Sequence, residues 1–203
     1  MKSSSLKEKS FIPVKKYAAL FIFLFIGSIL FLLEHFNEEP LSTENLVKRE
    51  TFNQEKSDVG FLAPNFTLKN LDGNYVGLDN FKNQVVVLNF WATWCAPCRV
   101  EMPYFENLYR RYRSRGLTVL AISLDKGNVE GIKSFVDEYG LSFPILLDPD
   151  GKAERLYPSF TIPFTYVVDK FGRVSARVDG AKNWGSEETY EAIEYLLNQP
   201  EDK

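Results

Sequence analysis

The chain of 203 residues has two cysteines, Cys95 and Cys98, and a single histidine, His35. A structural zinc site takes about four ligands, and one Cys-x-x-Cys pair supplies only half of them, so zinc bound within one chain is not expected. Two cysteines are also too few for a secreted scaffold that depends on several disulfides. We therefore predict no metal site, and we assign both thiols to one redox site.

The sequence also lacks the basic surface that nucleic acid requires. Its formal net charge is −3, but residues 1–33 carry five Lys/Arg and one acidic residue, which gives +4 and leaves −7 for the rest of the chain. Hydrophobic residues make up 45% and charged residues 25%. This length and composition predict one globular domain with an appendage.

The appendage contains the one long apolar run, Tyr17–Leu33, which has no charged residue. This is at the short end of what a membrane-spanning helix needs, and Phe11–Val14 can extend it into the interface. A cleaved signal peptide is the alternative, but no small-x-small site follows the run. We therefore expect an uncleaved anchor over 17–33. The basic residues before it place residues 1–16 in the cytoplasm and everything after residue 33 on the outer face.

Residues 34–59 have no hydrophobic periodicity and carry seven acidic residues against three basic ones. This composition predicts a solvated linker between the anchor and a domain over 60–203. His35 lies at the membrane end of this linker, where a polar residue at the interface is a simpler explanation than a ligand or base.

The hydrophobic pattern of the domain predicts an α/β fold, because short β-branched runs alternate with segments of helical periodicity. Asp72-Gly73 predicts a hairpin turn between the first two strands. Asn128 and Ser186 are candidate helix N-caps, and Gly116 and Gly140 are candidate helix ends. The predicted strands are 66–69, 75–78, 85–91, 117–123, 143–147, 164–169 and 173–178, and the predicted helices are 99–115, one from Asn128 to Gly140, a short turn at 153–157, and 186–198.

The two cysteines lie between the predicted strand 85–91 and the predicted helix that follows it. Free backbone N–H groups and the helix dipole at such a junction favour a thiolate at Cys95. Pro97 suits the first turn of a helix, where its missing N–H would have no partner. A purely structural disulfide is the alternative, but one that closes so short a loop gives little stability. The spacing therefore predicts a redox-active pair.

Several motifs together resemble the TlpA/ResA-type membrane-anchored thiol–disulfide oxidoreductases, which have a thioredoxin-like fold. They are Ala63–Leu68, the segment Leu88–Cys98, Glu101-x-Pro103, and Ile162-Pro163 ahead of a late strand. The resemblance covers residues 60–198. It implies a central mixed β-sheet flanked by helices, with an N-terminal β-hairpin and an inserted helix–strand segment between Asn128 and Leu147.

The resemblance also implies roles for individual residues. Cys95 is the exposed nucleophile that attacks a substrate disulfide, and Cys98 is the buried thiol that resolves the mixed disulfide. Thioredoxin has a buried Asp six residues before the first cysteine, and this chain has Asn89 there. The relatives have a glutamate near the active site at the position of Glu101, so the resemblance gives the proton-transfer role to Glu101. The alternative is an ordinary glutamate on the helix surface.

For the substrate, the resemblance implies a cis Pro163 that presents the main chain of Ile162 to an extended polypeptide. A trans loop proline is the alternative. Trp94 and Pro97 offer an apolar rim beside the cysteines, whereas Trp91 is expected in the core.

The function that the resemblance implies is reduction of protein disulfides outside the cytoplasm, such as the haem-attachment cysteines of an apocytochrome c. Electrons would come from a CcdA/DsbD-like thiol transporter in the membrane, with no cofactor besides the Cys95–Cys98 disulfide. A dithiol oxidase or isomerase of secreted proteins is an alternative. A copper chaperone is another, although such proteins usually add a downstream histidine and none follows His35. A peroxiredoxin-type peroxidase would need a Pro-x-x-x-Thr-x-x-Cys motif, which is absent.

Overall fold

A computed structural model describes residues 25–29, 31 and 57–200 of the chain. The chain divides into two units, Met1–Arg49 and Glu50–Lys203. In the first unit, residues 25–29 and 31 are helical. Within the described residues no helix is both long enough and apolar enough to cross a membrane. Most of the predicted anchor 17–33, the segment 1–16, His35 and nearly all of the linker lie outside the described residues.

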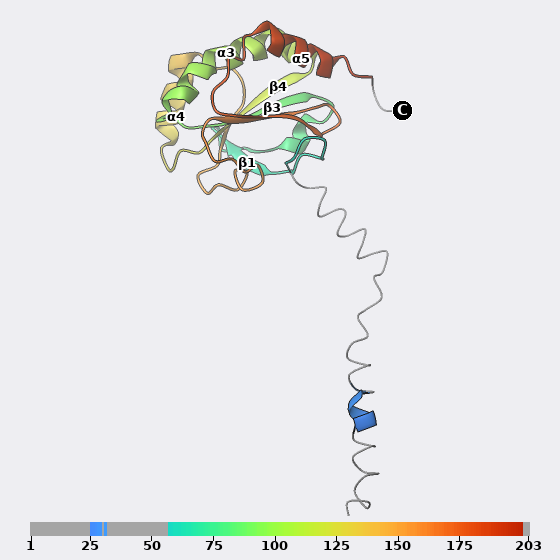
Figure 1. The fold of residues 1–203 in the computed structure, drawn as a ribbon. Helices are drawn as coiled ribbons and strands as arrows, with labels where there is room; N and C mark the ends of the chain where they lie inside the picture. Colours follow the sequence, from blue (N-terminus) through green and yellow to red (C-terminus); the bar gives the residue numbers. More distant parts are fainter. Residues whose placement is uncertain (1–24, 30, 32–56, 201–203) are drawn as a thin grey trace, which may run out of the picture. The chain divides into compact units, whose positions relative to one another are not determined.

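The second unit alternates strands and helices and forms a thioredoxin-like α/β fold (Figure 1). Its strands are β1 (Thr67–Asn70), β2 (Tyr75–Gly77), β3 (Val85–Trp91), β4 (Leu117–Ser123), β5 (Ile145–Leu147), β6 (Phe164–Val168) and β7 (Val174–Asp179). Its α-helices are α3 (Ala96–Tyr112), α4 (Val129–Tyr139) and α5 (Glu187–Leu197), and its short 3-10 helices are η1 (Leu78–Phe81) and η2 (Arg113–Arg115).

The seven strands form one mixed sheet in the order β2-β1-β5-β4-β3-β6-β7. Strand β3 lies parallel to β4, and β4 lies parallel to β5, whereas the other neighbours are antiparallel. Every residue of β3 and β4 is buried. Continuous apolar runs are typical of strands that are covered on both faces, which explains why both strands could be predicted to the residue.

All three α-helices pack on one face of the sheet (Figure 1). The core on this face joins alternate residues of β3, such as Val87 and Trp91, to Met102 and Phe105 of α3. The opposite face is covered by loops, and its core contains Phe90, Phe164 and Tyr157. The rings of Phe90 and Phe164 stack with their centroids 4.4 Å apart. The sheet is therefore buried on both faces although helices cover only one.

Local capping signals place most of the helix ends. Asn128 accepts a hydrogen bond from the Gly131 N–H at 2.9 Å and begins α4, and Gly140 ends it in the left-handed region at φ +58°. Ser186 caps α5 in the same way. Gly116, at φ +93°, ends the segment that begins with α3. These four predictions are confirmed.

Helix α3 begins at Ala96, three residues before the predicted start at Arg99. The reason is that Cys95 itself is the N-cap, so both the alanine and the proline of the motif lie in the first turn. The helix continues through Pro103 to Tyr112. Its early start brings Cys98 inside the helix and Cys95 to its N-terminus.

Candidate active site

The cysteines form a disulfide at the point where β3 passes into α3. Their Cα atoms are 5.3 Å apart. The Cys95 Sγ accepts a hydrogen bond from the Cys98 N–H at 3.3 Å, as a side-chain cap does. Cys95 is 5% exposed and Cys98 is fully buried. Cys95 is therefore less exposed than the predicted nucleophile, but it is the more accessible of the two cysteines. A negative charge on its sulfur would lie at the positive end of the helix dipole, whereas Cys98 faces the core.

A buried carboxylate just after the neighbouring strand β4, that of Asp125, fixes the loop before Cys95. Asp125, which follows the end of β4, accepts hydrogen bonds from the Thr93 N–H at 2.9 Å and the Thr93 hydroxyl at 2.6 Å. It also accepts one from the Ser123 hydroxyl at 2.9 Å. These bonds tie the β3–α3 loop to the end of the parallel partner of β3. Asp125 is therefore a positioning residue for the cysteines.

The loop before β6 lies next to the end of β3 that leads to the disulfide. Strand β6 starts at Phe164, directly opposite Phe90, and runs antiparallel to β3. Residues that precede Phe164 therefore lie beside the loop that follows Trp91. The Ile162–Pro163 peptide bond is cis, as predicted. The topology thus brings together two motifs that are far apart in the sequence.

The predicted substrate-binding residues beside Cys95 are exposed, whereas those in the cis-proline loop are partly or fully buried. Trp94 is 69% exposed and Pro97 is exposed, so both are available for contact, whereas Trp91 is fully buried as expected. Pro163 is buried, and Ile162 is half-buried. Within the described residues, no hydrogen bond involves the main-chain N–H or C=O of Ile162. Both groups therefore remain free to pair with another chain.

Glu101 is not a surface residue, because its side chain is only 1% exposed. Its Oε1 accepts hydrogen bonds from the Lys182 N–H at 2.7 Å and from Trp184 Nε1 at 2.8 Å. Its Oε2 is buried and has no hydrogen-bond partner among the described residues. Burial raises the pKa of Glu101 above its ordinary value, and the two hydrogen bonds oppose that rise without cancelling it. A raised pKa makes the protonated carboxyl of Glu101 easier to form. Glu101 lies one helical turn after Cys98, so it is a candidate for proton exchange with that thiol.

Asn89 lies in the centre of β3 and is fully buried. Its Nδ2 donates to the Thr165 hydroxyl of β6 at 3.1 Å, and its Oδ1 has no partner among the described residues. An amide does not titrate, so this position cannot take or release a proton. Glu101, by contrast, is a buried titratable group on the helix that carries the cysteines.

Sequence reasoning missed Trp184 and Asp125. Trp184 is 3% exposed and packs on Phe105 with ring centroids 5.0 Å apart. A buried indole needs an acceptor for its N–H, so a tryptophan in the loop before the last helix was a usable signal. Asp125 lies two residues after the end of the buried parallel strand β4, and side chains at that end of a sheet commonly serve the site there. Neither signal identifies its partner without the tertiary structure.

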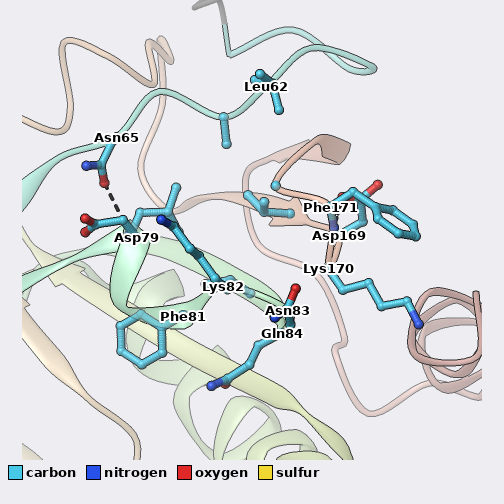
Figure 2. Close-up of a pocket in the computed structure, with 15 residues that line it drawn as sticks. Leu62, Asn65, Asp79, Phe81, Lys82, Asn83, Gln84, Asp169, Lys170 and Phe171 are labelled. Carbon is cyan, nitrogen blue, oxygen red and sulfur yellow. Dashed lines mark hydrogen bonds between the residues drawn. The ribbon is translucent and has the colours of Figure 1, made fainter. Parts of the chain in front are cut away.

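A separate hollow of about 470 Å³ lies at the opposite end of the sheet (Figure 2). Val86 at the start of β3 and Val168 at the end of β6 line it, together with Leu62, Phe81 and Phe171. It is therefore remote from the disulfide along both strands. Among the described residues, no group of three or more His, Cys, Asp or Glu side chains could hold a metal ion.

Comparison with known proteins agrees with this geometry. Residues 59–177 match the model of the AhpC/TSA family. The thiol–disulfide oxidoreductase ResA of Bacillus thuringiensis subsp. konkukian is 36% identical over 146 residues, which cover 72% of this chain and 80% of that protein. ResA of Bacillus subtilis is 34% identical over 127 residues, which cover 63% of this chain and 70% of that protein.

Solved structures give the same result. A candidate DsbE thiol:disulfide interchange protein from Chlorobium tepidum aligns with a TM-score of 0.64 and 31% identity, covering 70% of this chain and 99% of that one. A secreted thiol-disulfide isomerase from Corynebacterium glutamicum aligns with a TM-score of 0.62 and 28% identity, covering 68% and 86% of the two chains.

The raised pKa of Glu101 predicts a specific dependence of stability on pH. The folded state favours the protonated carboxyl, so this contribution to stability is complete below the ordinary glutamate pKa and is lost as the pH rises through the folded pKa. We expect Glu101→Gln to remove this loss, so that stability relative to the wild type increases as the pH is raised from about 4. Urea unfolding at a series of pH values measures it.

Glu106 of the same helix is the matched control. Burial raises its pKa, but hydrogen bonds from the Ser142 N–H, from Arg110 and from the Ser142 hydroxyl outweigh burial and lower it overall. The contribution of Glu106 to stability is present above the ordinary glutamate pKa and is lost as the pH falls through its lowered folded pKa. Glu106→Gln should therefore lose stability at neutral pH. The same pH dependence in both variants would contradict the assignment for Glu101.

Proposed function

The chain belongs to the ResA-type thiol–disulfide oxidoreductases of the AhpC/TSA family, and from that membership we propose that it reduces disulfides of proteins outside the cytoplasm. The observation that carries this proposal is the asymmetry of the cysteine pair. Cys95 is the N-cap of α3 and keeps 5% exposure beside the exposed Trp94 and Pro97, whereas Cys98 is fully buried inside the helix.

The reaction begins with both cysteines reduced. The Cys95 thiolate attacks one sulfur of the substrate disulfide, which breaks that bond and releases the other substrate sulfur as a thiolate. The Cys98 thiolate then attacks the Cys95 sulfur and releases the second substrate thiol. Two electrons pass from the dithiol to the substrate, the leaving thiolates take up two protons, and the Cys95–Cys98 disulfide forms. A thiol donor must reduce it again.

Glu101 is the proton acceptor for the second step in this proposal. Cys98 is fully buried, and a buried thiol loses its proton only to a base that can reach it. Glu101 lies one helical turn further along α3, also buried, with one carboxylate oxygen that has no described partner. The Trp184 and Lys182 N–H groups hold its other oxygen in place.

The substrate is an extended polypeptide segment that pairs with the free main-chain groups of Ile162. Such pairing adds a short strand at the edge of the site and brings the substrate disulfide to Cys95. Trp94 and Pro97 provide exposed apolar contact next to the sulfur. Through its resemblance to the cytochrome c maturation reductants, we propose the haem-attachment cysteines of an apocytochrome c as substrate and a CcdA/DsbD-like transporter as electron donor.

The direction of the reaction separates this proposal from a dithiol oxidase. Reducing enzymes such as thioredoxin have a potential of about −270 mV, and the oxidant DsbA has about −120 mV. Equilibration of the Cys95–Cys98 couple with glutathione measures this potential. A value near that of DsbA would favour the oxidase.

We further propose that residues 17–33 anchor the protein in the cell membrane with residues 1–16 in the cytoplasm. The support is the uncharged run and the basic residues that precede it. The acidic segment 34–59 then connects the anchor to the domain on the outer face.

Exchange of each cysteine for serine tests the assignment of nucleophile. Cys95→Ser should abolish reduction of insulin disulfides, because the attacking sulfur is removed and Cys98 is fully buried. Cys98→Ser should accumulate mixed disulfides with substrates, because the attacking sulfur remains and the resolving one is absent. Non-reducing gels with mass spectrometry detect these adducts. Accumulation in Cys95→Ser in place of Cys98→Ser would reverse the two roles.

Glu101→Gln keeps the size of the side chain and removes its proton. We expect kcat for disulfide reduction to fall about 100-fold, a typical contribution of a positioned base. In the wild type the rate should fall in acid as Glu101 becomes protonated, at a higher pH than for an ordinary glutamate because its pKa is raised. This acid limb should be absent in Glu101→Gln and unchanged in Glu106→Gln. An identical profile in wild type and Glu101→Gln would rule out the role.

The anchor predicts that the full chain stays with membranes after washing at high salt, because apolar insertion does not depend on screened charges. Fractionation of untagged cells, followed by N-terminal sequencing of the recovered protein, measures this. Recovery of a free form that begins shortly after residue 33 would indicate cleavage instead.

A further inference from the structure

The loop that precedes the cis proline carries a fully exposed aromatic side chain, Phe160. Single exposed apolar residues are common on protein surfaces and need no explanation. Phe160 differs because it lies two residues before Ile162, in the loop that the topology places beside the disulfide. Trp94, which directly precedes Cys95, is 69% exposed, and Val100 in the second turn of α3 is 65% exposed. Exposed apolar side chains therefore occur both in the segment that carries Cys95 and in the loop that the topology places beside it.

The backbone around Phe160 is held from both sides. The Tyr166 hydroxyl, from the fully buried Tyr166 of β6, donates to the Pro158 carbonyl at 3.0 Å. The Ser159 hydroxyl donates to Asp179 Oδ1 at 2.6 Å. The Thr161 N–H in turn donates to Ser159 Oγ at 3.3 Å. Ser159 is thus tied directly to a side chain of the sheet, and Thr161 is tied to it through Ser159.

Asp179 is itself held in place. Arg177 donates to both of its carboxylate oxygens, through Nε and Nη2, each at 3.0 Å. The Gly180 N–H, directly after β7, donates to the Pro163 carbonyl at 2.9 Å. The end of β7 therefore braces the loop at Ser159 and again at Pro163. All of these contacts are polar, and among the described residues the Phe160 ring has no aromatic or cation–π partner.

We propose that Phe160 is a specificity residue that binds a bulky apolar side chain next to the reactive cysteine of the substrate. This rests on the proposed function, since it assumes that a polypeptide pairs with Ile162. A fixed loop that presents an aromatic ring pays little conformational entropy when the ring is buried by a partner. Phe160 belongs to the cis-proline loop, whereas Trp94 and Val100 belong to the segment that carries Cys95. The substrate class is a disulfide polypeptide with an apolar residue beside its target cysteine.

Two disulfide peptides that differ at one position test this inference. One carries leucine and the other carries serine next to the cysteine that is attacked. Their kcat and KM are measured with the full chain after reduction. The wild type should prefer the leucine peptide about tenfold in kcat/KM, mainly through a lower KM, because burial of a large apolar side chain is worth a factor of this size.

In Phe160→Ser this preference should fall to about one, whereas Phe160→Leu should restore most of it because it keeps an apolar side chain. Tyr75→Ser is the matched control, since Tyr75 is also an exposed aromatic residue, at 70%, but lies on β2 at the far edge of the sheet. It should keep the preference of the wild type. An equal loss of rate for both peptides in Phe160→Ser would assign the residue to loop structure and overturn the proposal.

Two further results have distinct meanings. A dimer of the wild type that Phe160→Ser converts to a monomer would show that a second copy covers the ring, and would also overturn the proposal. Reduction of hydroxyethyl disulfide by the wild type reports the thiol chemistry alone. Its absence would contradict the proposed function, whereas its presence without a preference between the peptides would contradict only the role of Phe160.

Discussion

The site depends on how the chain turns from β3 into α3 at the edge of the sheet. The turn must place Cys95 at the helix N-terminus, bury Cys98 completely and leave no polar group of the backbone without a partner. Asp125 meets part of this requirement by accepting from the Thr93 N–H and hydroxyl. The Cys95 sulfur meets another part by accepting from the Cys98 N–H. The hydrogen bonds of Asp125 come from the end of β4, and the N-cap is Cys95 itself. The sheet and the first turn of the helix therefore set the geometry of the cysteine pair together.

A second constraint is the buried carboxylate of Glu101. Burial of an acid is costly, and the fold limits this cost by placing two N–H donors on one oxygen and by raising the pKa so that the neutral form is more accessible. The donors come from Lys182 and Trp184, in the segment between β7 and α5. The packing of Trp184 on Phe105 holds that segment against the cysteine helix. A group that could transfer protons is thereby kept away from solvent, on the buried side of the disulfide.

The two ends of the sheet differ in the loops and side chains that they bring together. The end with the disulfide joins the β3–α3 loop, the cis-proline loop and the loop after β7. The opposite end has an apolar hollow lined by Val86, Val168 and Phe171 and lacks the cysteines (Figure 2). In a parallel or mixed sheet the loops at one edge meet because strand direction brings them there. The polar clamps through Asp125 and Asp179 both occur at the disulfide end, where loop positions matter for chemistry.

The sequence by itself determined the elements with strong local signals. Strands β3 and β4 are mostly apolar runs, Asn128 and Ser186 cap their helices, and Gly140 ends one of these helices. Each could therefore be placed from neighbouring residues. The redox chemistry of the cysteine pair was predicted from its spacing, from its place between a strand and a helix, and from the lack of further zinc ligands. Only the tertiary structure decided that Glu101 is buried against Trp184 and that Asp125 binds Thr93. It also decided that Pro163 is buried while Phe160 is exposed. The physical reason is that these contacts join residues up to 83 positions apart, and the order of the strands in the sheet brings them together.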